Sequence, residues 1–194
     1  MVGERGQAHT LEAFTAALLL IGGVVFALQV TAVTPLTAST SSQHVENQQL
    51  QMARGLLDSA VENGSLRRAV LHWNESDGTF FGSSAAGYYA SGGPPTTFGA
   101  MLNRTFRDRG IAMNVNAYYI TATGGTRMQE IVHFGAPSDN AVSARRTLTI
   151  YDDDNLTGST SKPVNDSNSY FAPDISPDTG LYNVLRVEVL IWRM

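Results

Sequence analysis

The chain has 194 residues, of which 43% are hydrophobic and 15% are charged, and it contains no cysteine. This length allows one domain of ordinary size with an additional segment, and a core that folds without cross-links. The lack of cysteine excludes disulfides, thiolate zinc sites and cysteine nucleophiles. The 17 acidic and 13 basic residues give a net charge of −4, so composition predicts no polybasic surface for nucleic acid.

The N-terminal region carries the strongest pattern in the chain. No residue from Ala13 to Gln43 is charged, and residues 13–33 are mostly apolar. A helix needs roughly 20 such residues to cross about 30 Å of hydrocarbon. Glycine and threonine interrupt the run, but both are tolerated in membrane helices because the backbone hydrogen bonds stay internal. The sequence therefore predicts a transmembrane helix over about residues 11–33.

Two interpretations of this segment need no relation to any family. A cleaved secretory signal would have a basic n-region and a shorter apolar core, whereas this n-region holds one arginine and one glutamate. A cut near Thr37–Ser39 would still release a soluble domain. A plain membrane anchor fits the hydropathy, but it leaves Glu12 without a role, since a carboxylate at the edge of hydrocarbon is costly unless it finds a partner.

A third interpretation gives Glu12 a role. Arg5, Gly6 and Gln7, followed by Glu12 and an unbroken apolar helix, resemble the class III signal of archaeal type IV prepilins. The resemblance implies a prepilin peptidase that cuts after Gly6 and leaves the apolar helix on the mature protein. The family commonly has its glutamate fifth, whereas a cut after Gly6 makes Glu12 sixth, so a cut after Gln7 stays open.

Glu12 has a physical role in such a filament. The apolar helices of neighbouring subunits pack together, and the carboxylate can neutralise the new N-terminal ammonium of a neighbour, which acts as a register device. The simpler alternative places Glu12 at the lipid headgroups, near a helix N-terminus where an acid is favourable. Arg5 is the only basic residue before the apolar run, so the positive-inside rule places the N-terminus in the cytoplasm and the head outside.

A second helical pattern follows the apolar run. Pro35 is expected to end or kink the first helix. Apolar residues then recur at helical spacing from Gln43 to Glu62, and Asn63-Gly64 closes the pattern. The predicted organisation is a leader over residues 1–6, a long N-terminal helix over 7–62 with a kink near 35, and a head over 63–194. Two separate helices joined by a linker are the alternative.

The first part of the head is expected to be helical with one long loop. Residues 65–73 predict a short helix with Ser65 as its N-cap. Residues 77–95 are rich in glycine, serine and tyrosine and predict a loop. Pro94-Pro95 then introduces a helix that Gly110 ends.

The rest of the head alternates with a period of two, which is typical of strands. The four predicted strands are Ile111–Thr121, Arg127–Phe134, Arg145–Tyr151 and Leu181–Trp192. The last is apolar enough to be central, and the polar segment 152–180 predicts a long loop. The expected fold class is α+β: a long N-terminal membrane-spanning helix, then a head with an antiparallel sheet of about four strands.

Five Asn-X-Ser/Thr motifs lie in the region expected outside the cell. This motif is an acceptor for N-linked sugar on surface loops of exported proteins. The possible sites are Asn63, Asn74, Asn103, Asn155 and Asn165. Asn103 falls in a predicted helix and is the least suited of the five.

The sequence predicts no catalytic centre, cofactor or metal site. The acidic run Asp152–Asp154 could offer oxygen ligands, but it lacks the spacing of an EF-hand loop, and a solvated acidic turn is favoured. The four histidines have no metal-ligand spacing, and no nucleophile elbow, P-loop or dinucleotide motif occurs. An enzyme is therefore the least favoured class of function.

The expected function combines these features. The chain looks like a pilin-like, membrane-anchored structural subunit, major or minor, of an archaeal type IV pilus-like surface filament, involved in assembly or adhesion. Its expected partners are a prepilin peptidase, other pilin-like subunits that bind through the N-terminal helix, and the membrane, with no nucleic acid. The single lysine, Lys162, against twelve arginines suits a halophile. The alternative is a membrane-anchored extracellular binding domain that does not polymerise.

Overall fold

The computed structural model describes the backbone of residues 3–158 and 161–193, and the side chains of residues 9–29, 43–158 and 161–193. The chain divides into two units, Met1–Val45 and Glu46–Met194. Helix α1, Gly3–Glu62, gives its first part to the first unit and its last part to the second. The head unit therefore includes the C-terminal turns of α1.

Helix α1 is continuous through Pro35. The expectation that Pro35 ends the helix is therefore wrong, and so is the alternative of two helices with a linker. A proline removes one backbone donor from the helical ladder, and the helix-forming segments on both sides outweigh that single loss. A bend at Pro35 remains a prediction.

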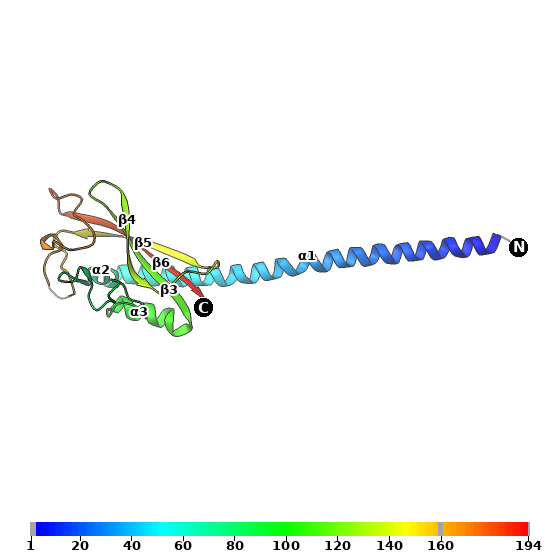
Figure 1. The fold of residues 1–194 in the computed structure, drawn as a ribbon, viewed down its shortest axis with the longest axis horizontal. Coiled ribbons are helices and arrows are strands. Elements are labelled where there is room, and N and C mark those ends of the chain that lie inside the picture. Colours follow the sequence, from blue (N-terminus) through cyan, green and yellow to red (C-terminus); the bar gives the residue numbers. More distant parts are fainter. Residues whose placement is uncertain (1–2, 159–160, 194) are drawn as a thin grey trace. The chain divides into compact units, whose positions relative to one another are not determined.

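The second unit contains an antiparallel sheet of four strands, as predicted. The strands are β3 (Ile111–Ile120), β4 (Thr126–His133), β5 (Val142–Tyr151) and β6 (Leu181–Arg193). Their order across the sheet is β4-β3-β6-β5 (Figure 1). The apolar strand β6 thus lies in the interior of the sheet, which confirms the expectation that it is central.

The register separates two chemically different faces of the sheet. Val189 of β6 pairs with Val115 of β3 on one side and Ala144 of β5 on the other, and all three are buried. One residue earlier on β6, Glu188 pairs with Asn116 and Arg145. Because successive side chains in a strand point to opposite faces, one face is apolar and the other carries a polar row.

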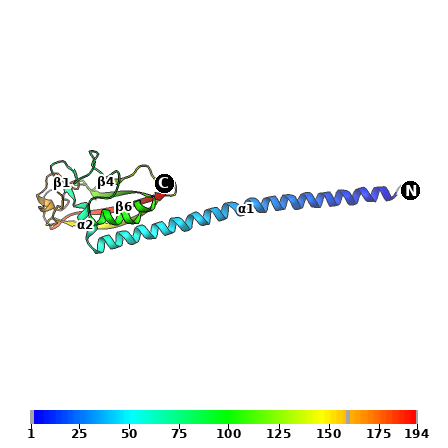
Figure 2. The same ribbon diagram turned by 90° about the horizontal axis from the view of Figure 1, so that it is seen from below.

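Helices cover the apolar face of the sheet. Side chains from the last part of α1 (Ala53 and Leu57), from α3 (Thr97–Thr105) and from the sheet belong to one hydrophobic cluster. Figures 1 and 2 show α3 and residues 46–62 of α1 alongside the strands. Burial of each large apolar side chain contributes about 1.5–3 kcal/mol, so this layer is the main source of stability of the head.

The short helix α2 (Ser65–Val70) begins differently from the prediction. Gly64 occupies the N-cap position with φ 71°, and Ser65 is the first helical residue. The side chain of Asn63 accepts a hydrogen bond from the Ser65 N–H (2.8 Å), while the Ser65 hydroxyl is buried and donates to the Ala60 carbonyl. The prediction of Ser65 as N-cap is wrong: Ser65 is already helical, and its hydroxyl points back to Ala60 instead of capping an N–H of the first turn.

Helix α3 follows Pro94-Pro95 as predicted. Thr96 is its N-cap, and its hydroxyl accepts a hydrogen bond from the Gly99 N–H (3.3 Å). The helix ends at Thr105, and a 3-10 turn, η1 (Arg107–Arg109), leads to Gly110 with φ 69°.

Two segments expected to be irregular contain short regular elements. Strand β1 (Trp73–Asn74) pairs with β2 (Thr79–Phe80), so the predicted helix over 65–73 is too long and the predicted loop over 77–95 is interrupted. Two-residue strands are too short to show a period. The described residues of the segment, 152–158 and 161–180, are irregular apart from η2 (Val164–Asp166) and a bridge between Asn155 and Pro163. Among them Leu156, Val164, Tyr170 and Ala172 are buried and anchor the segment.

Candidate functional site

The first candidate site is the apolar part of α1. Residues His9–Gln29 form a helix that is long and apolar enough to cross a membrane. Every one of these 21 residues is exposed within the chain. The large apolar side chains concerned are Leu11, Phe14, Leu18, Leu19, Leu20, Ile21, Val24, Val25, Phe26 and Leu28. A helix that is apolar all round requires either lipid or other helices around it.

Glu12 lies at the start of this segment. Its carboxylate is exposed, and Oε2 lies 3.8 Å from Nδ1 of His9. The hydroxyl of Thr15 donates to the backbone carbonyls of Leu11 and Glu12, so the Thr15 side chain needs no partner outside the helix. Within the described part of the apolar segment, Glu12 is the only acidic side chain, and it is available to a partner from outside the chain.

The residues of the predicted cleavage site lie in the first turns of α1. The backbone of Gly6 and Gln7 is helical, and their side chains lie outside the described residues. Cleavage after either residue therefore stays a prediction.

The five glycosylation motifs occupy different environments. Asn155 and Asn165 are exposed in the 152–180 segment, where Asn155 forms an isolated bridge with Pro163 and Asn165 lies in η2. Asn63 is exposed, but its amide is engaged with Ser65 and Met101. Asn74 is half-buried, and its Nδ2 donates to Asp77 (2.6 Å). Asn103 is half-buried in α3, where its Oδ1 accepts from the Gly93 N–H (2.9 Å).

The acidic run has specific partners inside the head. Asp154 forms an ion pair with Arg67 and accepts a hydrogen bond from the Tyr151 N–H. Asp153 is exposed, as a solvated turn requires. Burial, together with the nearby Asp174 carboxylate, raises the pKa of Asp152. Among the described residues no group of three His, Asp or Glu side chains is placed to hold a metal ion.

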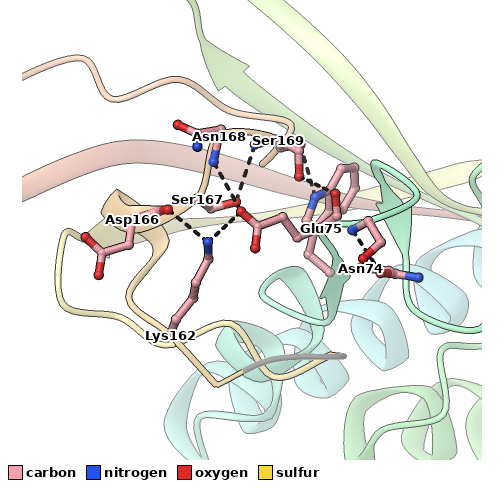
Figure 3. A network of polar contacts seen from close by, with 9 residues as sticks. Asn74, Glu75, Lys162, Asp166, Ser167, Asn168 and Ser169 are labelled. Atoms are coloured by element: carbon pink, nitrogen blue, oxygen red, sulfur yellow. Dashed lines mark hydrogen bonds and ion pairs between the residues drawn. The ribbon is translucent and has the colours of Figure 1, made fainter.

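A polar network that no local sequence pattern indicates fixes the 161–170 loop (Figure 3). Nζ of Lys162 donates to the Glu75 carboxylate (2.6 Å) and to the Asp166 carbonyl (2.9 Å). The same carboxylate accepts from the Asn168 N–H, and the Ser169 hydroxyl donates to the Glu75 carbonyl (2.9 Å). The hydrogen bond from Lys162 lowers the pKa of Glu75. The solitary lysine was the only available signal.

Together these observations define a class of protein: an α+β head with a four-stranded antiparallel sheet, on a chain whose N-terminal helix is apolar enough to span a membrane. Residues 5–191 match the model of a family of unknown function, DUF7288, and the chain belongs to that family. No curated protein and no solved structure matches the chain.

Proposed function

We propose that this protein is a membrane-anchored, pilin-like subunit of a surface filament. The observation that carries the proposal is the segment His9–Gln29, which exposes apolar side chains on all sides and contains one acid, Glu12. At 1.5 Å per residue, the segment is about as long as the hydrocarbon layer is thick. It suits the membrane before assembly and a bundle of identical helices afterwards.

The position of Glu12 supports polymerisation over simple anchoring. In a bundle of apolar helices its carboxylate would be desolvated, and a lone charge there is strongly unfavourable. The α-amino group created by cleavage after Gly6 or Gln7 supplies an opposite charge on a neighbouring subunit. Such an ion pair would fix the axial register of neighbouring subunits more than it would stabilise the filament, because the cost of desolvating both charges offsets their attraction. In a plain anchor, Glu12 would lie at the lipid headgroups near the helix N-terminus and would need no partner.

The head supports a structural role. It is built on the last turns of α1, whose Ala53, Leu57 and Ala60 side chains are buried in the head core. An ion pair between Asp58 of α1 and Arg146 of β5 adds a further link. A head whose core includes the last turns of α1 suits a subunit of an ordered filament.

Cleavage is tested by the N-terminus of the native protein. We expect intact mass and N-terminal sequencing of protein from native membranes to give a start at Gln7 or Ala8, with the apolar helix retained. An intact Met1 would overturn the pilin mechanism and leave a plain anchor. A start near Thr40 would instead show a secreted soluble domain.

Assembly is tested at Glu12. We expect Glu12→Ala and Glu12→Gln to abolish incorporation into sheared surface filaments, while the protein still accumulates in the membrane. Glu62→Ala is the matched control, because Glu62 is an exposed glutamate in the last turn of the same helix. If both Glu12 variants enter the filaments as the wild type does, Glu12 is not the assembly residue. If the wild type itself is present in the membrane and absent from the filaments, the protein is a non-polymerising anchored domain.

A further inference from the structure

A cleft in the head lies between the β3–β4 hairpin and the segment 165–174. Its volume is about 640 Å³, within the range of small-molecule sites. Tyr119 and Arg127 come from the hairpin, and Asn168, Phe171 and Asp174 come from the loop. The loop side of the cleft is held by the Lys162 network of Figure 3, so its walls are fixed by contacts outside the cleft.

Two aromatic rings form the apolar part of the cleft. Tyr119 and Phe171 are both half-buried, and their ring centroids are 5.5 Å apart at an interplanar angle of 70°. Phe171 is supported from within the head by Tyr170 (4.4 Å) and Trp73 (5.5 Å). The rings therefore offer a preorganised apolar surface that costs little side-chain entropy on binding.

Polar groups surround the rings. The side chains of Arg127, Asn165 and Asn168 are exposed, and none makes a hydrogen bond or ion pair with another described residue. Oδ1 of Asp174 accepts a hydrogen bond from the Ser176 N–H (2.8 Å), which leaves Oδ2 to accept from a ligand. The cleft thus presents hydrogen-bond donors and acceptors on planar groups: two amides, the positive guanidinium of Arg127 and the negative carboxylate of Asp174.

We infer that this cleft binds a neutral saccharide. A pyranose has an apolar face of C–H groups, which packs on aromatic rings, and an edge of hydroxyls, each a donor and an acceptor. Amide, carboxylate and guanidinium groups match those hydroxyls. A nucleotide or other polyanion would need more positive charge than Arg127 supplies, and no other described residue that lines the cleft is a cation. The inference concerns the head alone and does not rest on filament assembly.

The saccharide has two possible sources with the same chemistry. Asn165 lines the cleft and belongs to an Asn-X-Ser motif, so a glycan attached there would be tethered beside the rings. A free sugar or a glycan on another molecule would enter from solvent. Recognition by Tyr119, Phe171 and Asn168 is common to both.

The test uses the full chain from a host without N-glycosylation, held in a detergent without a sugar headgroup. Saturation-transfer-difference NMR with the methyl glycosides of mannose, glucose and galactose, and with N-acetylglucosamine, at millimolar concentration, is expected to show transfer to at least one sugar. Asn168→Ala and Tyr119→Ala should abolish the transfer. Asn168→Ala removes an exposed side chain, so it leaves the fold intact.

Phe81→Ala is the control, because Phe81 is 40% exposed and lies outside the cleft. The inference would be overturned if no sugar received saturation from the protein, or if the wild type and both cleft variants transferred saturation equally.

Protein from native membranes then separates the two sources. If a glycan at Asn165 blocks sugar binding until the glycan is removed, the tethered glycan is the ligand. If Asn165 carries no glycan and the cleft still binds sugar, the ligand comes from outside the chain. Both results support the cleft, and neither depends on Glu12.

Discussion

Nζ of Lys162 donates a 2.6 Å hydrogen bond to the carboxylate of Glu75, across a separation of 87 residues along the chain. This contact ties the short β1–β2 hairpin to a loop that has little regular structure of its own. Loops of this length are usually mobile unless side chains anchor them. The geometry of the proposed cleft therefore depends on a salt bridge between residues that do not line it.

Removing that lysine is expected to loosen the loop without unfolding the head. In Lys162→Met the Glu75 carboxylate loses its cation, and the Asp166 carbonyl loses a donor. Hydrogen–deuterium exchange of the full chain should become faster in peptides covering residues 161–171 and stay unchanged in β6. The control is Arg104→Ala, which removes an exposed cation from α3. Unchanged exchange in the loop would show that its apolar anchors suffice.

A close approach of two backbone segments requires glycine at position 99. A Cβ on Gly99 would lie 1.7 Å from the Pro94 carbonyl oxygen, and that atom cannot move as a side-chain tip would. Gly99→Ala is expected to lower the free energy of unfolding of the head by about 1–3 kcal/mol, as overpacking does.

The measurement is urea unfolding followed by the fluorescence of Trp73 and Trp192, which are both buried in the head. Gly55→Ala is the matched control, because a Cβ on this exposed helical glycine meets no atom within 4 Å. That variant should gain about 0.5–1 kcal/mol from the better helix propensity of alanine. Equal stability of the two alanine variants would contradict the prediction.

The polar row on the outer face of the sheet has a buried carboxylate at its centre. Glu188 accepts hydrogen bonds from Nε of Arg145 (2.7 Å) and from the Tyr118 hydroxyl (2.8 Å), and its side chain is only 7% exposed. Burial raises the pKa of Glu188, but these hydrogen bonds outweigh burial, and the pKa lies below its ordinary value of 4.5.

Because the folded-state pKa is lowered, the stabilisation is fully present above pH 4.5 and is lost as the pH falls through the folded value. Glu188→Gln is expected to destabilise the head by about 1–3 kcal/mol at neutral pH, and the difference from wild type should shrink in acid. Urea unfolding at several pH values measures it. Glu62→Gln, at an exposed position, should show no such dependence, and a constant difference for Glu188→Gln would count against the mechanism.

The sequence identified the elements whose residues repeat regularly. The alternation over Ile111–Thr121 and the dense apolar run over Leu181–Trp192 each predicted a strand, because each pattern records how the strand is buried. The β1–β2 hairpin was missed because two residues show no period. The cleft was missed for a different reason: Tyr119 and Phe171 come together only through the tertiary fold, and no local pattern encodes the Glu75–Lys162 contact that holds their loop.

The structure also ranks the glycosylation motifs. An acceptor asparagine must offer its side-chain nitrogen to an enzyme from a flexible or turn-like segment. Asn155 and Asn165 are exposed outside the α-helices and the four-stranded sheet, whereas Asn103 lies in α3 and its Oδ1 accepts a hydrogen bond from the Gly93 N–H. We expect glycopeptide mass spectrometry of the native protein to find sugar at Asn155 and Asn165 and none at Asn103.

Asparagine-to-glutamine variants test this ranking one position at a time. Asn155→Gln and Asn165→Gln should each lower the mass of the native protein by one glycan, and Asn103→Gln should leave it unchanged. Sugar at Asn103 would contradict the prediction, because it would mean that modification precedes the packing of α3. Asn165 is the informative position, because a glycan there would lie at the edge of the Tyr119–Phe171 cleft, which is the saccharide site that we infer for the same head.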